Sequence, residues 1–160
     1  MNVKIEKLTD ENRDIARNII KKWLADFIIT RGRKVYPAEM EGFLALDENG
    51  ETIGMVTFEI IGDQCEVVTL DAFKQWNGIG STLLKKVEEV ARERKCKRLW
   101  LITINSNIDA IRFYQKRGMT LAAVHVNALE YSRKLKPQIP MIGEYGIPMR
   151  DEVEFEMWLE

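Results

Sequence analysis

Residues 75–80 read QWNGIG, and this short stretch decides how the chain around it folds. It follows the apolar run VVTL at residues 67–70 and precedes the periodic stretch STLLKKVEEV at residues 81–90. The pattern predicts a strand, a glycine-rich turn and then a helix. Such a turn directs unpaired N–H groups and the positive end of the helix dipole towards one point, which suits a phosphate or pyrophosphate.

The two glycines of this turn give the main chain room for a ligand, because Gly78 and Gly80 have no Cβ. Taken alone, two such glycines more often mark a tight loop that binds nothing. Two other phosphate-binding motifs do not fit. A Walker A loop has Lys before Ser or Thr after its second glycine, whereas Ser81 follows Gly80 directly; the dinucleotide fingerprint has a third glycine where Leu83 stands.

A second segment, NSNIDAIRFYQKRGM at residues 105–119, predicts a helix that begins after the N-cap Asn107 and stops at Gly118. The order Gln-x-x-Gly-x-Gly, then Asn-x-x-Ala-x-x-x-Tyr-x-x-x-Gly, resembles the GNAT superfamily of N-acetyltransferases. The resemblance covers roughly residues 1–126 in element order as well as in motif. Two positions depart from the common pattern: Gln75, where many members have Arg, and Met119, where an aromatic residue is frequent.

The resemblance implies acetyl-CoA as the acetyl donor and an amine as the acceptor, with Tyr114 as the acid that protonates the departing sulfur. Tyr114 as a core tyrosine with a bonded hydroxyl is the alternative. Glu66 is the candidate general base, with Glu59 and Asp71 as rivals. A backbone N–H near Leu70 would stabilise the tetrahedral intermediate. The predicted cofactor-binding residues are Leu70, Gln75, Trp76, Asn77, Gly78, Ile79, Gly80, Ser81, Asn107 and Tyr114.

Two functions remain open at this level. The first is an N-acetyltransferase that moves an acetyl group from acetyl-CoA to a primary amine of a small molecule or peptide, by direct attack in a ternary complex. The second is an acyl-CoA-binding regulatory module with the same fold and little turnover. The presence of Tyr114 favours the enzyme.

Composition sets the class of protein. The 160 residues contain 46% hydrophobic and 31% charged side chains and have a formal net charge of −1, which are values for one globular domain over residues 1–160. No global basic field is present to hold nucleic acid.

The N-terminus lacks a signal-peptide pattern and no stretch has the length of a membrane span, so we expect a cytoplasmic protein. Cys65 and Cys96 fit no metal spacing, and we expect no metal. His125 lies in a strand-like alternation of side chains. A lone His can act as a general base, but we expect His125 to be a strand residue with an ordinary partner.

The element order predicts an α/β (α+β) fold: a mixed, mostly antiparallel sheet of six to seven strands with helices on both faces. The first helix is predicted to have Thr9 or Asp10 as its N-cap. Residues 30–41 break the helical pattern of apolar side chains. The predicted strands are residues 3–8, 43–47, 52–61, 65–71, 98–104 and 119–126, and the long helix after the glycine turn runs to about Lys95.

The C-terminal segment, residues 127–160, is expected to be a variable part of the domain. Residues 127–136 suggest a short helix, and residues 152–159 alternate acidic and apolar side chains as a strand does. The loop between them is rich in Pro and Gly yet carries many apolar side chains. We predict that it forms part of the wall of the acceptor pocket, with Glu144 and Tyr145 at its middle. A cap over the sheet or a homodimer contact is the alternative.

Overall fold

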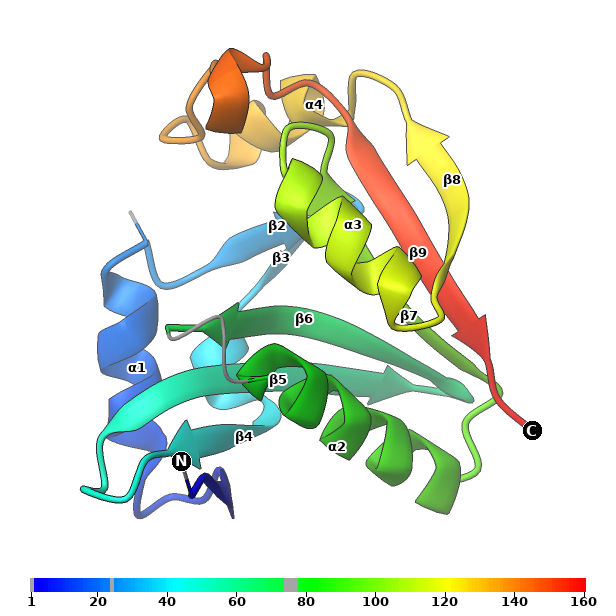
Figure 1. Cartoon of the computed structure of the whole chain (residues 1–160). Coiled ribbons are helices and arrows are strands. Elements are labelled where there is room, and N and C mark those ends of the chain that lie inside the picture. The colour runs from blue at the N-terminus through cyan, green and yellow to red at the C-terminus, as the bar shows by residue number, and fades with distance from the viewer. Residues whose placement is uncertain (1, 24, 74–77) are drawn as a thin grey trace.

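The computed structural model describes residues 2–23, 25–73 and 78–160. In this part of the chain, seven strands form one sheet in the order β1-β4-β5-β6-β7-β9-β8, and a separate two-stranded sheet joins β2 and β3 (Figure 1). Only the pair β6–β7 is parallel among these described strands, so the sheet is mixed and mostly antiparallel, as predicted. The strands are β1 Lys4–Lys7, β2 Ile28–Thr30, β3 Arg33–Val35, β4 Glu41–Leu46, β5 Thr52–Ile61, β6 Gln64–Ala72, β7 Arg98–Ile104, β8 Thr120–His125 and β9 Glu152–Trp158.

The helices cover both faces of this sheet, which confirms the predicted architecture. They are α1 Arg13–Lys21, α2 Ile79–Glu93, α3 Ile108–Lys116 and α4 Ala128–Leu135, with short 3₁₀ turns at Pro37–Glu39 and Glu144–Gly146. One core cluster joins α2 and α3 to one face, and a smaller cluster joins α1 to the other. We refer to these as the α2/α3 face and the α1 face.

Gly54 on β5 lets α2 lie close to the α2/α3 face. A Cβ at this position would stand 2.7 Å from Cγ2 of Ile79 and 2.9 Å from the carbonyl oxygen of Asp71. Such a short approach to backbone leaves no room for a side chain. The glycine therefore fixes the start of α2 directly over β5 and β6, where the glycine-rich turn ends.

The prediction for the first helix was wrong at its start. Thr9 and Asp10 do not cap it, because the chain first makes a turn in which Oδ1 of Asn12 accepts a hydrogen bond from the N–H of Thr9 at 2.8 Å. The Asn12 amide then donates to the carbonyl oxygen of Lys7, so Asn12 ties the turn to β1 and occupies the N-cap position. The helix consequently begins at Arg13.

Residues 30–41 break the helical pattern as predicted, but the sequence indicated no strand there, and β2 and β3 pair as a hairpin around Arg31 and Gly32. Three-residue strands are too short to show a two-residue period. This β2–β3 hairpin meets the C-terminal segment. Nζ of Lys136 donates to the carbonyl oxygen of Phe27 at 2.8 Å, and the buried Glu152 accepts two hydrogen bonds from Arg31. The β2–β3 hairpin and the C-terminal segment therefore lie together and form one wall on the α1 face.

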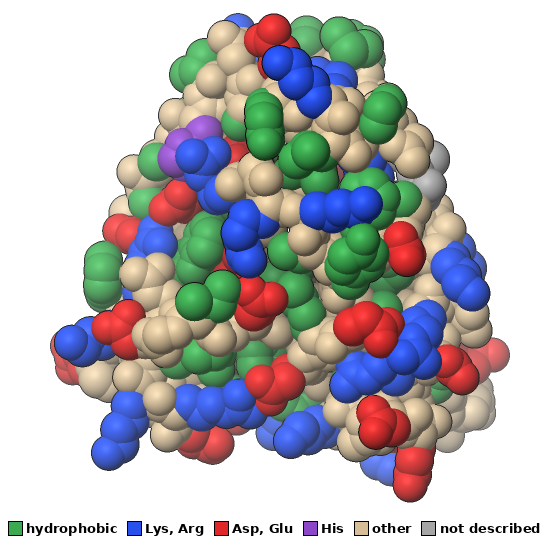
Figure 2. Space-filling view, turned by 180° about the vertical axis from the view of Figure 1, so that it is seen from behind, with side chains coloured by type: hydrophobic (Ala, Val, Ile, Leu, Met, Phe, Trp, Pro, Cys, Tyr) green, Lys and Arg blue, Asp and Glu red, His purple; other side chains and the backbone are tan. Residues whose placement is uncertain are grey.

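The alternating acidic side chains of β9 bind basic groups of the same protein. Arg98 forms ion pairs with Glu154 and Glu156, and Nε2 of His125 lies 2.8 Å from Oε1 of Glu154. His125 is thus a strand residue with an ordinary partner, as the sequence indicated. Figure 2 shows acidic and basic side chains interspersed over the rear surface. No helix in the described part of the chain is long and apolar enough to cross a membrane.

Candidate active site

The sheet divides between β6 and β7. Their parallel pairing ends at Val67 and Leu101, although β6 continues along β5 to Ala72 and β7 continues along β9 to Ile104. A β-bulge on β6 begins at the same place, because Val67 and Thr69 pair with consecutive residues of β5 and Val68 is left between them. Bulges bend a strand and increase its twist. The division therefore leaves one side of β6 without a strand partner among the described residues from Val68 onwards.

The start of α2 lies beside this division. Gly78 occupies the N-cap position with a φ of 67°, a left-handed conformation that favours glycine. No side chain of a described residue caps the helix and its first turn has no acidic residue, so no described side chain occupies the N–H groups of Ile79, Gly80 and Ser81, which suit an anion. The side chain of Ile79 is buried in the core. The predicted contacts of Gln75, Trp76 and Asn77 lie outside the described residues.

Tyr114 lies on the inward face of α3 and is 8% exposed. Its ring packs against Phe155 of β9 with a centroid distance of 5.8 Å. Burial, with a further contribution from the charge of Asp71, raises the pKa of Tyr114 well above its usual value. Its hydroxyl forms no hydrogen bond with another described residue, unlike an ordinary core tyrosine. Asn107 precedes α3 as predicted, but its side-chain amide donates to Oγ1 of Thr103 instead of capping the helix.

Glu66 lies on β6 just before the division and points to the α1 face, opposite the buried Cys65 and Val67. Burial raises its pKa, and hydrogen bonds from Thr30 and Arg33 act in the opposite direction. Oγ1 of Thr30 donates to Oε2 at 2.6 Å, and Nη2 of Arg33 donates to Oε1 at 3.2 Å. Both oxygens of Glu66 therefore have a partner on the β2–β3 hairpin.

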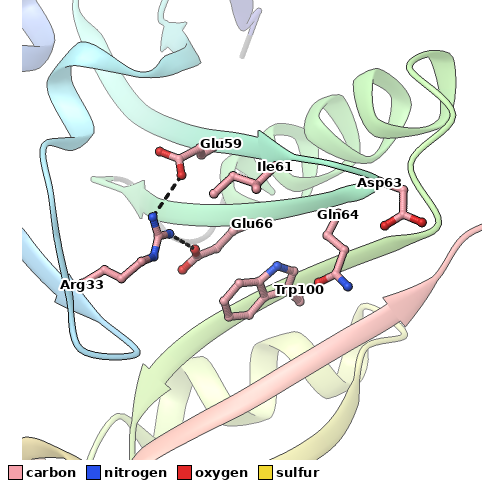
Figure 3. A pocket seen from close by; sticks show the side chains of 7 residues that line it. All are labelled: Arg33, Glu59, Ile61, Asp63, Gln64, Glu66 and Trp100. Carbon is pink, nitrogen blue, oxygen red and sulfur yellow. Dashed lines mark hydrogen bonds and ion pairs between the residues drawn. The ribbon is translucent and has the colours of Figure 1, made fainter.

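An acid-rich pocket of about 330 Å³ opens on this face next to Glu66. Figure 3 shows Arg33 between Glu59 and Glu66, with Trp100 across from them. Three carboxylates against one arginine make the pocket favourable for a cation. It is lined by Arg33, Glu59, Ile61, Asp63, Gln64, Glu66 and Trp100.

Asp71 also lies on β6, beyond the division. It pairs with Met55, whose side chain belongs to the α1 face, so Asp71 points to the same face as Glu66. Its Oδ2 is buried and accepts no hydrogen bond from a described residue. Burial raises the pKa of Asp71 from 3.8 to about 6. The sequence offered Asp71 only as a rival base, since nothing in LDAF at residues 70–73 signals that one carboxylate oxygen is buried and unpaired.

The raised pKa of Asp71 predicts a pH-dependent gain in stability for Asp71→Asn. Because the folded-state pKa lies above the unfolded one, the stability contributed by this group is full below about pH 4 and is lost as the pH rises through 6. One unit of pKa shift corresponds to about 1.4 kcal/mol, so we expect a gain on the order of 2 kcal/mol near neutral pH. Urea denaturation at neutral and acidic pH measures it. The exposed Asp10→Asn is the control, and an Asp71→Asn variant without a larger gain at neutral pH would contradict the shift.

No group of three or more His, Cys, Asp or Glu residues that suits a metal ion occurs in the described ranges. Both cysteines are free and buried, and burial raises the pKa of Cys65 to about 12. The division of the sheet, the start of α2 and the buried Tyr114 are thus the features of this site that suit a ligand and a proton transfer.

Comparison with known proteins gives the class. The sequence model of the Acetyltransferase (GNAT) family matches residues 7–119. The uncharacterized protein YdhI of Bacillus subtilis (strain 168) is 50% identical over 117 residues, which are 73% of each chain. The chain belongs to the GNAT acetyltransferase family.

Solved structures agree in fold. The IAA acetyltransferase from Bacillus cereus ATCC 14579 superposes with a TM-score of 0.72 at 21% identity, over 99% of this chain and 100% of that one. A GNAT family acetyltransferase from Elizabethkingia anophelis, solved with acetyl-CoA bound, gives a TM-score of 0.71 at 24% identity over 99% of both chains. The likeness therefore extends over residues 120–160 as well, beyond the range of the family match.

Proposed function

We propose that the protein transfers the acetyl group of acetyl-CoA to a primary amine of a small molecule or peptide, by direct attack of the amine in a ternary complex. The observation that carries this proposal is the division between β6 and β7 beside the start of α2. A thioester with a long polar arm and a pyrophosphate needs both features at once: a free strand edge for the arm and N–H groups for the phosphates.

The donor would lie along β6. The N–H groups of Ile79, Gly80 and Ser81 would bind the pyrophosphate, and the main chain of Leu70 would pair with the pantetheine arm. Gln75, Trp76, Asn77 and Asn107 remain predicted contacts. The acetyl-CoA held by the similar enzyme from Elizabethkingia anophelis supports this choice of donor. The residues present fit the group, because no acidic side chain opposes phosphates at the first turn of α2.

Acyl transfer from a thioester requires that the amine lose a proton before it attacks and that the leaving sulfur gain one. Tyr114 would protonate the sulfur. Its unbonded hydroxyl keeps its proton in the free enzyme, because burial raises its pKa. A backbone N–H near Leu70 would stabilise the negative oxygen of the tetrahedral intermediate. Glu66 remains the base that the sequence predicts.

The acceptor would approach from the α1 face, where the pocket beside Glu66 has carboxylates on several sides. This charge supports a cationic amine. The β2–β3 hairpin and the C-terminal segment would enclose it. Tyr145, at the middle of the loop predicted to form part of the acceptor pocket, contacts α3. The hydroxyl of this exposed residue donates to Asp109 at 2.9 Å. Its role in acceptor binding stays a prediction, as does a homodimer.

Release of free thiol from acetyl-CoA, measured with a panel of primary amines and peptides, tests the proposal. Background from the protein is expected to be small, because Cys65 and Cys96 are buried and burial raises the pKa of both thiols. Amine-dependent thiol release with acetylated product supports the enzyme. Tight acetyl-CoA binding without release for any amine supports the alternative, a regulatory module. Loss of both would reject the proposed site.

A further inference from the structure

Asp71 is a polar group that the fold leaves unsatisfied at the proposed site. Its Oδ2 is buried without a hydrogen-bond donor among the described residues, and such a group destabilises the folded state. Buried unpaired carboxylates are rare in folded proteins, and where they occur in a cleft they suggest a role with a ligand. The residue as a whole is half-buried, whereas Oδ2 itself is buried.

The position of Asp71 brings it near the reacting groups. It follows Leu70 on the part of β6 that has separated from β7, four residues beyond the end of the parallel pairing at Val67. Its charge is, after burial, a second cause of the raised pKa of Tyr114. Tyr114 packs on the α2/α3 face and Asp71 points to the α1 face, so the two groups approach the gap in the sheet from opposite sides.

No positively charged side chain among the described residues lowers the pKa of Asp71, because burial is the one cause of its shift, and Lys74 lies outside the described part of the chain. Its strand partner on β5 is Met55, and the α1 residues packed around Met55 include the apolar Ala16 and Ile20. The first turn of α2, residues 79–81, is uncharged. Tyr114 on α3 is a titratable group whose pKa the charge of Asp71 raises. Within residues 25–73 and 78–160, the site therefore has no cation of the kind that ordinarily accompanies a buried carboxylate.

Glu66 differs from Asp71 in this respect. Its two oxygens accept hydrogen bonds from Thr30 and Arg33, and the Arg33 guanidinium stabilises its ionised form. The ion pair with Arg33 opposes protonation of this carboxylate, because it lowers the pKa of Glu66. Its contacts instead hold the β2–β3 hairpin against the sheet, which is a positioning role.

We infer that Asp71 binds the ammonium group of the acceptor and takes the proton that must leave before attack. The inference rests on the proposed acetyl transfer. The first proton passes from nitrogen to the carboxylate of Asp71, and the nitrogen lone pair then forms the bond to the thioester carbon. When the C–S bond breaks, its electron pair goes to sulfur, which receives the Tyr114 proton. The second proton of the nitrogen restores Tyr114, and Asp71 releases its proton to solvent.

The decisive experiment compares Asp71→Asn and Glu66→Gln with the wild-type protein, using the amine that gives the fastest thiol release. We expect Asp71→Asn to lower kcat by about 10²- to 10⁴-fold, the usual contribution of a general base, with acetyl-CoA affinity within about twofold. The wild-type kcat/KM for the amine should show an inflection at about pH 6, separate from the ionisation of the amine itself, that Asp71→Asn removes and Glu66→Gln retains. Asp10→Asn makes the same chemical change at an exposed site and should match the wild type.

Two results would overturn the assignment: an Asp71→Asn variant with kcat within about tenfold of wild type, or loss of the inflection in Glu66→Gln alone. A turnover-independent measurement separates this inference from the proposed function. The sample is wild-type protein with ¹³C-labelled aspartate carboxyl groups, saturated with coenzyme A. The Asp71 resonance is identified as the one that is missing from the spectrum of Asp71→Asn. It should titrate near pH 6 and shift when n-propylammonium is added. If no amine releases thiol, this shift still supports Asp71 as the ammonium site, and its absence rejects it.

Discussion

Tyr114→Phe is expected to lower turnover by about 10²- to 10⁴-fold while acetyl-CoA affinity stays nearly unchanged. The substitution removes one hydroxyl and keeps the ring that packs against Phe113 and Phe155. No hydrogen bond of that hydroxyl to a described residue is lost, so stability should change little. Without the acid, the sulfur leaves as a thiolate or takes its proton from water. Steady-state thiol release and calorimetry with acetyl-CoA measure the two effects separately.

Tyr36→Phe is the matched control, because Tyr36 is 42% exposed and packs near Phe27 on the hairpin side of the molecule. It removes the same atom without touching α3 or the division of the sheet. We expect wild-type turnover from it. Full turnover in Tyr114→Phe with the best amine would make Tyr114 a structural residue and assign the proton to water or another group.

Gly80→Val should weaken acetyl-CoA binding tenfold or more, which is about 1.4 kcal/mol or above. A Cβ at Gly80 would already lie 3.3 Å from Cζ of Phe113, and we expect the added methyl groups to extend towards the space where the pyrophosphate would lie. They would hold the phosphates away from the N–H groups of the first turn of α2. Calorimetry measures the affinity, and circular dichroism verifies that the variant is folded.

Gly50→Val serves as the control for this change. Gly50 lies in the turn between β4 and β5, where a Cβ would meet nothing within 4 Å, although its φ of 78° makes any side chain there strained. We expect lower stability and unchanged affinity. A folded Gly80→Val protein that binds acetyl-CoA as tightly as wild type would show that the phosphates do not lie at this turn.

Local signals explain which elements could be predicted. The sequence predicted β5 and β7 to the residue, because turn residues bound the first and mostly apolar residues form the second. The stop of α3 at Gly118 follows from its φ of 94°, which glycine tolerates. The start of α1 was mispredicted because Asn12 uses its side chain in a turn with β1, and propensity alone does not reveal that contact.

The candidate site divides in the same way. The glycine turn and Tyr114 are recognisable because each belongs to a motif contained within one turn and one helix. The contacts of Glu66 are not, since Thr30 and Arg33 come from a hairpin more than 30 residues earlier in the chain. The unpaired state of Asp71 depends on which side chains are missing around it after packing, and no short pattern records such an absence.

The position of β9 has a consequence for how the chain folds. In the sheet, β9 lies between β7 and β8 and pairs with both (Figure 1). In the sequence, however, β9 comes after both of these strands. Pairing of residues 152–158 with 98–104 closes a loop on the order of 50 residues, which is a slow step in folding. Until it occurs, β7 and β8 expose unpaired edges that can recruit other chains. A nascent chain stalled after α4 would contain the glycine turn and Tyr114 but lack Phe155 beneath the ring, and we expect it to aggregate instead of binding acetyl-CoA.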